Sequence, residues 1–154
     1  MARFQYRMQN ILNIKLKLEE QAKNDYAIAR VKLNEEEDKL KKLQDRKIDY
    51  EEKNRKLLET KLKLKDIFEN YRAIEVLKQL IKNQLVNIKK AEADLEVQRL
   101  RLQEVMQERK THDKLKEKAF EEFVKEENSK ESKEIDELTS YLYGKKIDRK
   151  GTEN

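Results

Sequence analysis

Neither glycine nor proline occurs before Gly144 in this chain of 154 residues. Proline breaks helices and glycine weakens them, and a globular domain of this size would normally use both residues in its turns. Charged residues make up 45% of the chain and hydrophobic residues 36%. That is too little apolar surface for a multilayer core but enough for one narrow seam. The sequence therefore predicts very long helices that pair as a coiled coil.

Apolar residues in the first half recur with the alternating three- and four-residue spacing of a coiled coil. The predicted seam positions there are Phe4, Met8, Ile11, Lys15, Leu18, Ala22, Tyr26, Ala29, Leu33, Glu36, Leu40, Leu43, Lys47, Tyr50, Asn54 and Leu57. The step from Ala22 to Tyr26 breaks the alternation. It predicts a stutter, which would locally unwind the supercoil.

A second seam is predicted in the second half of the chain. Its positions are Ile74, Lys78, Ile81, Leu85, Ile88, Glu92, Leu95, Arg99, Leu102, Met106, Arg109, Asp113, Lys116, Phe120 and Phe123. From Arg109 to Lys116 a shifted face fits better, made of Val105, His112, Leu115 and Ala119. We therefore expect the register to slip in that stretch.

A chain reversal is predicted at residues 59–66, where apolar residues alternate with lysines instead of following helical spacing. Asp66 followed by Glu69 resembles a capping box, with Asp66 as the N-cap of a new helix. This division gives one coiled-coil domain over 1–143, with arms of similar length at about 3–58 and about 67–143. One continuous helix in a parallel dimer is the alternative.

The end of the chain changes character after residue 143. Ile135, Leu138 and Leu142 continue a helical stripe, and Gly144 can then act as a C-terminal cap. Basic residues follow, so 144–154 is predicted to be a flexible, disordered basic tail. Arg3 and Arg7 give the N-terminus the same sign of charge, and a hairpin would bring both basic ends to one tip.

Enzymatic chemistry has almost no support in this sequence. There is one histidine, His112, and no cysteine, so neither a zinc site nor a disulfide is expected. Both glycines lie near the end of the chain, which excludes a phosphate-binding glycine-rich loop. We predict no catalytic residue, no metal site and no cofactor. His112 is best explained as a seam residue or a solvated one.

Charge and hydropathy limit the classes of partner. The net charge of +5 is small for so charged a chain, and acids are interleaved with the bases, so nucleic acid is not indicated. The longest apolar run has only four residues, at 26–29, which predicts no membrane span and a cytoplasmic protein. Tyr6, Phe68 and Tyr141 lie outside the predicted seam and would face water or a partner.

Three segments carry a resemblance to a known family: FQYRMQNIL at 4–12 with 15–20 after it, ERK at 108–110 followed by LKEK at 115–118, and ESKEIDE at 131–137. They resemble the flagellar FliJ family, the soluble stalk-like components of the flagellar type III export ATPase complex. The resemblance implies an antiparallel two-helix coiled coil whose paired ends sit in the pore of a hexameric export ATPase. It also implies binding to the export-gate membrane protein and to export chaperones.

The resemblance also suggests site residues. The predicted ATPase-binding tip consists of Phe4, Arg7, Ile11, Leu12, Ile135, Leu138 and Leu142. The family's gate-binding surface maps onto Leu43, Tyr50, Ile74, Lys78, Ile81 and Leu85. Lys78 and Leu85 depart from the polarity seen in some family members. The protein would be cytoplasmic and peripherally associated with the cytoplasmic face of the inner membrane at the flagellar base, without inserting into the membrane.

We therefore predict an all-α, non-enzymatic adaptor of flagellar protein export, shaped as a long antiparallel hairpin. An injectisome stalk homologue is the nearest alternative. A nucleic-acid-associated coiled coil would instead bind with steep salt dependence. A plain structural coiled coil would form a parallel homodimer with twice the 18.7 kDa chain mass.

Overall fold

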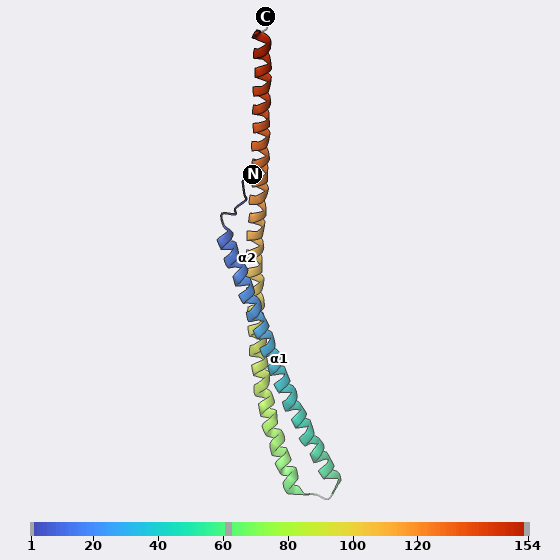
Figure 1. Ribbon diagram of the computed structural model, residues 1–154. Helices are drawn as coiled ribbons and strands as arrows, with labels where there is room; N and C mark the ends of the chain where they lie inside the picture. Colours follow the sequence, from blue (N-terminus) through green and yellow to red (C-terminus); the bar gives the residue numbers. More distant parts are fainter. Residues whose placement is uncertain (1, 61–62, 153–154) are drawn as a thin grey trace. The chain divides into compact units, whose positions relative to one another are not determined.

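The computed structural model describes residues 2–60 and 63–152 and contains two helices there (Figure 1). Helix α1 spans Gln9–Glu59 and helix α2 spans Leu64–Thr152. No strand occurs among the described residues, so the all-α prediction is confirmed. The two helices have 51 and 89 residues, so the prediction of arms of similar length is wrong.

Tertiary contacts divide the chain into two units. One unit contains the residues up to Lys17 together with those from Gln107 onward, and the other spans Leu18–Met106. In each unit a stretch of α1 pairs with a stretch of α2 in antiparallel direction, as Lys15 with Glu108 illustrates in the first. The predicted intramolecular hairpin of two helices is therefore confirmed.

The seam on α1 follows an unbroken seven-residue repeat. Its buried and half-buried members are Leu12, Lys15, Glu19, Ala22, Tyr26, Ala29, Leu33, Glu36, Leu40, Leu43, Lys47, Tyr50, Asn54 and Leu57. The stutter predicted at Ala22 is wrong. Leu12 and Glu19 are buried in the seam, whereas the predicted seam residues Ile11 and Leu18 are exposed. With those two positions, three- and four-residue steps alternate throughout, as a left-handed coiled coil requires.

The seam on α2 is equally regular. It consists of Ile67, Asn70, Ile74, Leu77, Ile81, Gln84, Ile88, Ala91, Leu95, Gln98, Leu102, Val105, Arg109, His112, Lys116, Ala119 and Phe123. The register slip predicted near Arg109 is wrong, since the same repeat continues through His112 to Phe123.

Half of the predicted α2 seam is displaced by one residue. Of the predicted positions, Lys78, Leu85, Glu92, Arg99 and Phe120 are exposed. The neighbours that face α1 instead are Leu77, Gln84, Ala91, Gln98 and Ala119. The predicted phase took the more apolar neighbour at Leu85 and Phe120, but the more polar one at Lys78, Glu92 and Arg99. A seam that contains glutamines as well as apolar residues does not reveal its phase from the pattern of one helix.

The apolar core is small and lies near the middle of the second unit. Leu33, Ile88 and Ala91 form a buried cluster, against which Leu40 and Leu95 pack. Each such side chain contributes roughly 1.5–3 kcal/mol when fully removed from water. Polar residues occupy many other seam positions, so the pairing also depends on hydrogen bonds between the helices.

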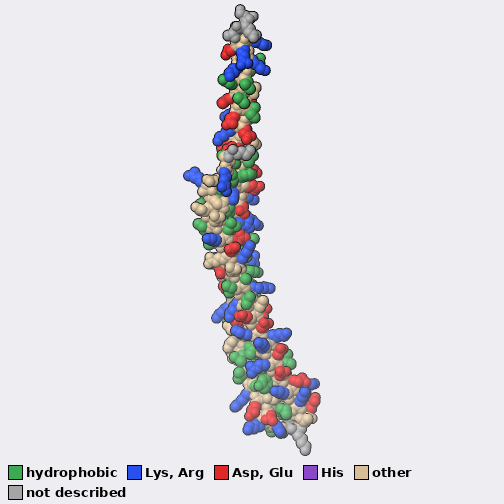
Figure 2. Space-filling view, in the orientation of Figure 1, with side chains coloured by type: hydrophobic (Ala, Val, Ile, Leu, Met, Phe, Trp, Pro, Cys, Tyr) green, Lys and Arg blue, Asp and Glu red, His purple; other side chains and the backbone are tan. Residues whose placement is uncertain are grey.

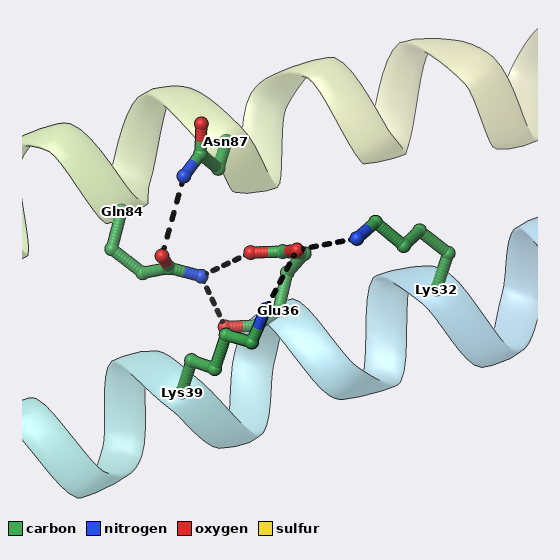
Figure 3. A network of polar contacts seen from close by, with 5 residues as sticks. All are labelled: Lys32, Glu36, Lys39, Gln84 and Asn87. Carbon is green, nitrogen blue, oxygen red and sulfur yellow. Dashed lines mark hydrogen bonds and ion pairs between the residues drawn. The ribbon is translucent and has the colours of Figure 1, made fainter.

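Glu36 is the centre of one such network, drawn in Figure 3. The Gln84 side-chain amide donates to the Glu36 backbone carbonyl at 2.8 Å and also to its carboxylate. Lys32 and Lys39 approach the same carboxylate at 2.9 and 3.5 Å along α1. Gln84 in turn accepts a hydrogen bond from Asn87. This network connects α1 to α2 at a seam position that carries a charge.

The network changes the acidity of Glu36. Hydrogen bonds from Lys32 and Gln84 lower the pKa of this carboxyl to about 2, from an ordinary value of 4.5. The same contact raises the pKa of Lys32. Both shifts favour the charged forms, so the ion pair and the cross-hairpin hydrogen bonds support one another.

Residues 2–8 precede the helix that the sequence predicted to begin at about residue 3. The backbone carbonyl of Tyr6 accepts a hydrogen bond from the backbone amide of Gln9 at 3.1 Å, and this bond forms a turn at the start of α1. No acidic residue occurs in the first turn of α1. Extending the helix upstream would place Arg3 and Arg7 at its positive end, which is unfavourable.

The turn between the helices begins after Glu59, and residues 61–62 of the predicted 59–66 reversal lie outside the described residues. The backbone amides of Asp66 and Ile67 both donate to the carbonyl of Lys63, at 3.1 and 3.2 Å. Asp66 therefore lies within the first turn of α2, and its predicted role as N-cap is wrong. Its carboxylate still lies near the positive end of the helix.

The predicted C-terminal cap at Gly144 is also wrong, because α2 continues through Gly144 to Thr152. A glycine cap requires a positive φ, which no described glycine adopts. Residues 128–151 are exposed throughout, so this part of α2 packs against no other described segment. We call 128–152 the lone helix. The flexibility predicted for 144–154 stays a prediction, and 153–154 lie outside the described residues.

Replacing Asn54 by leucine is expected to stabilise the hairpin. The Asn54 side chain is only 4% exposed, and neither polar atom of its amide has a hydrogen-bond partner among the described residues. Removing an unsatisfied amide and burying an apolar side chain should raise the free energy of unfolding by about 1–3 kcal/mol. Urea denaturation followed by circular dichroism measures this. The exposed change Asn24→Leu should stay within about 0.5 kcal/mol of wild type, and a destabilised Asn54→Leu would contradict the argument.

Glu36 should make the hairpin sensitive to acid. Because folding lowers the pKa of Glu36 from 4.5 to about 2, its contribution is present above pH 4.5 and is lost as the pH falls toward 2. Glu36→Gln should therefore be less stable than wild type at pH 7 and lose less stability over that pH range. Thermal unfolding at a series of pH values tests this, with Glu35→Gln as the exposed control. Parallel pH profiles for wild type and Glu36→Gln would refute it.

Candidate interaction surfaces

The N-terminal segment packs on an aromatic pair of α2. The Phe4 ring meets Phe120 edge-on, with 5.2 Å between ring centroids, and lies 5.4 Å from the ring of Phe123. Such aromatic contacts add to the stabilisation from burial. Leu12 follows on the seam and is buried, while Tyr6 is half-buried. The segment thus closes the last paired stretch of the first unit.

The predicted tip is not assembled as the sequence suggested. Phe4 and Leu12 pack against α2, whereas Arg7 and Ile11 are exposed. The expected packing of these N-terminal residues against Ile135, Leu138 and Leu142 is wrong. Lys15 pairs with Glu108 of α2, and Phe4, eleven residues earlier in the chain, packs on Phe120, twelve residues later in α2. In this register no described residue of the N-terminal segment lies opposite residue 135.

The lone helix exposes a large apolar stripe instead. Ile135, Leu138 and Leu142 are 63%, 59% and 53% exposed and follow one another at three- and four-residue spacing. In Figure 2 blue basic side chains gather toward the end of this helix, with acidic side chains nearer its paired part. Lys145 lies over the ring of Tyr141, 5.1 Å from the centroid. A stripe of this kind, unpartnered in one chain, is a candidate binding surface.

Most residues of the predicted gate-binding surface belong to the seam. Leu43, Tyr50 and Ile81 are half-buried and Ile74 is buried between the helices. Lys78 and Leu85 are exposed, and Lys78 forms an ion pair with Glu75 at 3.1 Å. A partner binding the intact hairpin could therefore reach Lys78 and Leu85 directly, but would meet little of Ile74.

A different apolar group is exposed on the early part of α2. Phe68, at 64% exposed, lies near Tyr71 and Val76, and together with Arg72 and Glu75 they line a shallow groove. We call Phe68, Tyr71 and Val76 the outer patch. The sequence singled out Phe68 as lying off the seam but missed the other two. Their spacing from Phe68 would have identified them once the seam phase was known.

No group of three or more His, Asp or Glu side chains among the described residues could hold a metal ion. His112 occupies a half-buried seam position, as one of the two sequence interpretations held.

Within residues 2–60 and 63–152, neither helix offers a stretch apolar enough to cross a lipid bilayer.

Comparisons with known proteins give consistent results. The family model described as "Flagellar FliJ protein" matches residues 4–147. No curated protein matches the sequence. A solved structure, described as that of a proposed YscO homolog, CT670, from Chlamydia trachomatis, has a TM-score of 0.69. It is 22% identical, and the match covers 92% of this chain and 96% of that one. That structural likeness supports the fold, and the family match covers nearly the whole sequence: the chain belongs to the FliJ family of flagellar export proteins.

Proposed function

We propose that this protein is a non-enzymatic adaptor of flagellar type III export that links the hexameric export ATPase to the export gate. The observation that carries the proposal is the lone helix, which exposes an apolar stripe and a basic end in a chain of the FliJ family. Unpaired apolar surface on a helix is stabilised when a partner covers it. The lone helix is the segment we assign to the pore of the ATPase ring.

Two features support that assignment. Lys145, Lys146, Arg149 and Lys150 lie in the last turns of α2, where the helix dipole already favours cations. These bases would meet acidic side chains or carbonyl oxygens in the pore, while Ile135, Leu138 and Leu142 supply apolar contact. The N-terminal residues Phe4 and Leu12 then act indirectly, by holding the last paired stretch of the hairpin together.

The gate contact is assigned to the outer patch together with Lys78 and Leu85. These residues are accessible without opening the hairpin, whereas Ile74 and Ile81 keep α1 and α2 together. Export chaperones are the third partner in the proposal, and the site of action is the cytoplasmic face of the inner membrane at the flagellar base. Flagellar rather than injectisome export is favoured by the family match.

Loss of the lone helix should abolish stimulation of the cognate ATPase. A chain ending at residue 127 should keep its melting temperature, because residues 128–151 are all exposed and so contribute little buried surface to the hairpin. Within the full chain, Leu138→Asp should reduce stimulation at least tenfold by placing a charge in the apolar stripe. Steady-state ATP hydrolysis measures both effects. The matched change Ser140→Asp, on the opposite face of the same helix, should leave stimulation unchanged. Full stimulation by the shortened chain would disprove the assignment.

The gate assignment separates exposed from buried positions. Phe68→Asp should weaken binding to the cytoplasmic domain of the gate protein at least tenfold without changing hairpin stability, since Phe68 is 64% exposed. Ile74→Asp should instead unfold the hairpin, because it buries a charge in the seam. Titration calorimetry measures the affinity for the gate domain and thermal unfolding measures hairpin stability, so together they distinguish the two variants. Val31→Asp, an exposed apolar position on α1, is the control, and unchanged gate affinity in Phe68→Asp would argue against the outer patch.

A further inference from the structure

The lone helix carries its own seven-residue repeat, distinct from the hairpin seam. Three- and four-residue steps alternate along one face through Glu131, Ile135, Leu138, Leu142, Lys145 and Arg149. All six side chains are exposed. This is the spacing that a helix presents to another helix in a coiled coil, yet no described segment of the chain covers it.

Charge along the lone helix changes sign about its middle, and on the stripe itself Glu131 lies at one end and Lys145 and Arg149 at the other. Glu131, Glu134, Asp136 and Glu137 precede the two leucines, with Lys130 and Lys133 beside them. Lys145, Lys146, Arg149 and Lys150 follow the leucines, with Asp148 as the one acid among them. Figure 2 shows the same separation on the visible face. A partner of uniform charge complements only one half of such a helix.

We propose that the lone helix pairs antiparallel with the lone helix of a second copy of this chain. With the repeat in register, Leu138 faces Leu142 of the partner subunit. Ile135 then faces Lys145 of the partner subunit, whose methylene stem covers it. Glu131 faces Arg149 of the partner subunit. A two-fold axis repeats each contact, so the surface is complementary to itself.

The direction of pairing follows from the charges. In a parallel pair each residue faces its own copy, which places glutamate against glutamate at 131 and arginine against arginine at 149. Like charges across a helix interface disfavour that arrangement. The antiparallel pair converts both repulsions into attractions. Three apolar anchors per copy make an interface below the usual size of a stable dimer, so we expect a Kd on the order of 100 μM.

This inference does not rest on the proposed function, because it requires only the exposed stripe and its charges. The two are connected nevertheless, since a helix paired with a second copy has no free stripe for the ATPase. The self-association assay and the ATPase assay report on them separately.

Exchange of charges tests the pairing in the full-length protein. In sedimentation equilibrium from 10 μM to 1 mM, Glu131→Lys alone and Arg149→Glu alone should each associate about tenfold more weakly than wild type. Their equimolar mixture should regain wild-type association, and so should the chain carrying both changes. In the doubly changed chain only antiparallel pairing restores attraction. Ser140→Asp is the control and should associate like wild type.

A distance measurement fixes the direction independently. The chain has no cysteine, so Ser132→Cys carries a single spin label. In the antiparallel pair residue 132 lies opposite residue 148 of the other copy, so the two labels are offset by about 16 residues, or roughly 24 Å at 1.5 Å per residue. A parallel pair would bring them to about 10 Å, the distance between helix axes. A wild-type chain that stays monomeric at 1 mM, a mixture no stronger than its components, or a 10 Å separation would each overturn the proposal.

Discussion

Tertiary stabilisation of the paired helices depends on one narrow stripe on each of them, because a two-helix structure has no second layer to bury. That stripe follows the same seven-residue spacing along α1 from Leu12 to Leu57 and along α2 from Ile67 to Phe123. Strict spacing keeps the stripes facing each other over many turns, which an isolated straight helix would not do. The remaining features, including the polar seam residues and the lone helix, follow from where this stripe runs and where it ends.

Some polar residues within the seam stabilise the pairing of the two helices and others weaken it. Glu36 is buried yet satisfied, since Gln84 donates to it from the opposite helix and Lys32 pairs with it. Asn54 is buried with both amide atoms unpaired. A buried amide at one seam position can specify register at a cost in stability. The hairpin thus contains polar contacts that join the helices and a buried amide that weakens their pairing, in a seam with few large apolar side chains.

The sequence was sufficient for the helical content, the antiparallel hairpin and most of the α1 seam, because these depend on periodicity and on the absence of glycine and proline. It failed where either of two neighbouring residues could take the seam position, as with Leu85 beside Gln84 and Ile11 beside Leu12. Whether a polar side chain can be buried depends on its partner across the hairpin, which one helix alone does not reveal. The tip residues failed for a related reason: arm lengths depend on where pairing stops, and Gly144 does not stop α2.

The end of pairing near Phe123 divides the chain by its tolerance of insertions and deletions. A single residue added within the seam would rotate everything beyond it by about 100° and misalign one helix against the other. Beyond residue 127 no opposing helix has to be matched, so length there can change in steps of seven without turning the exposed stripe to another face. A change of seven residues beyond residue 127 would therefore alter the length of this segment and leave the pairing of the two helices intact.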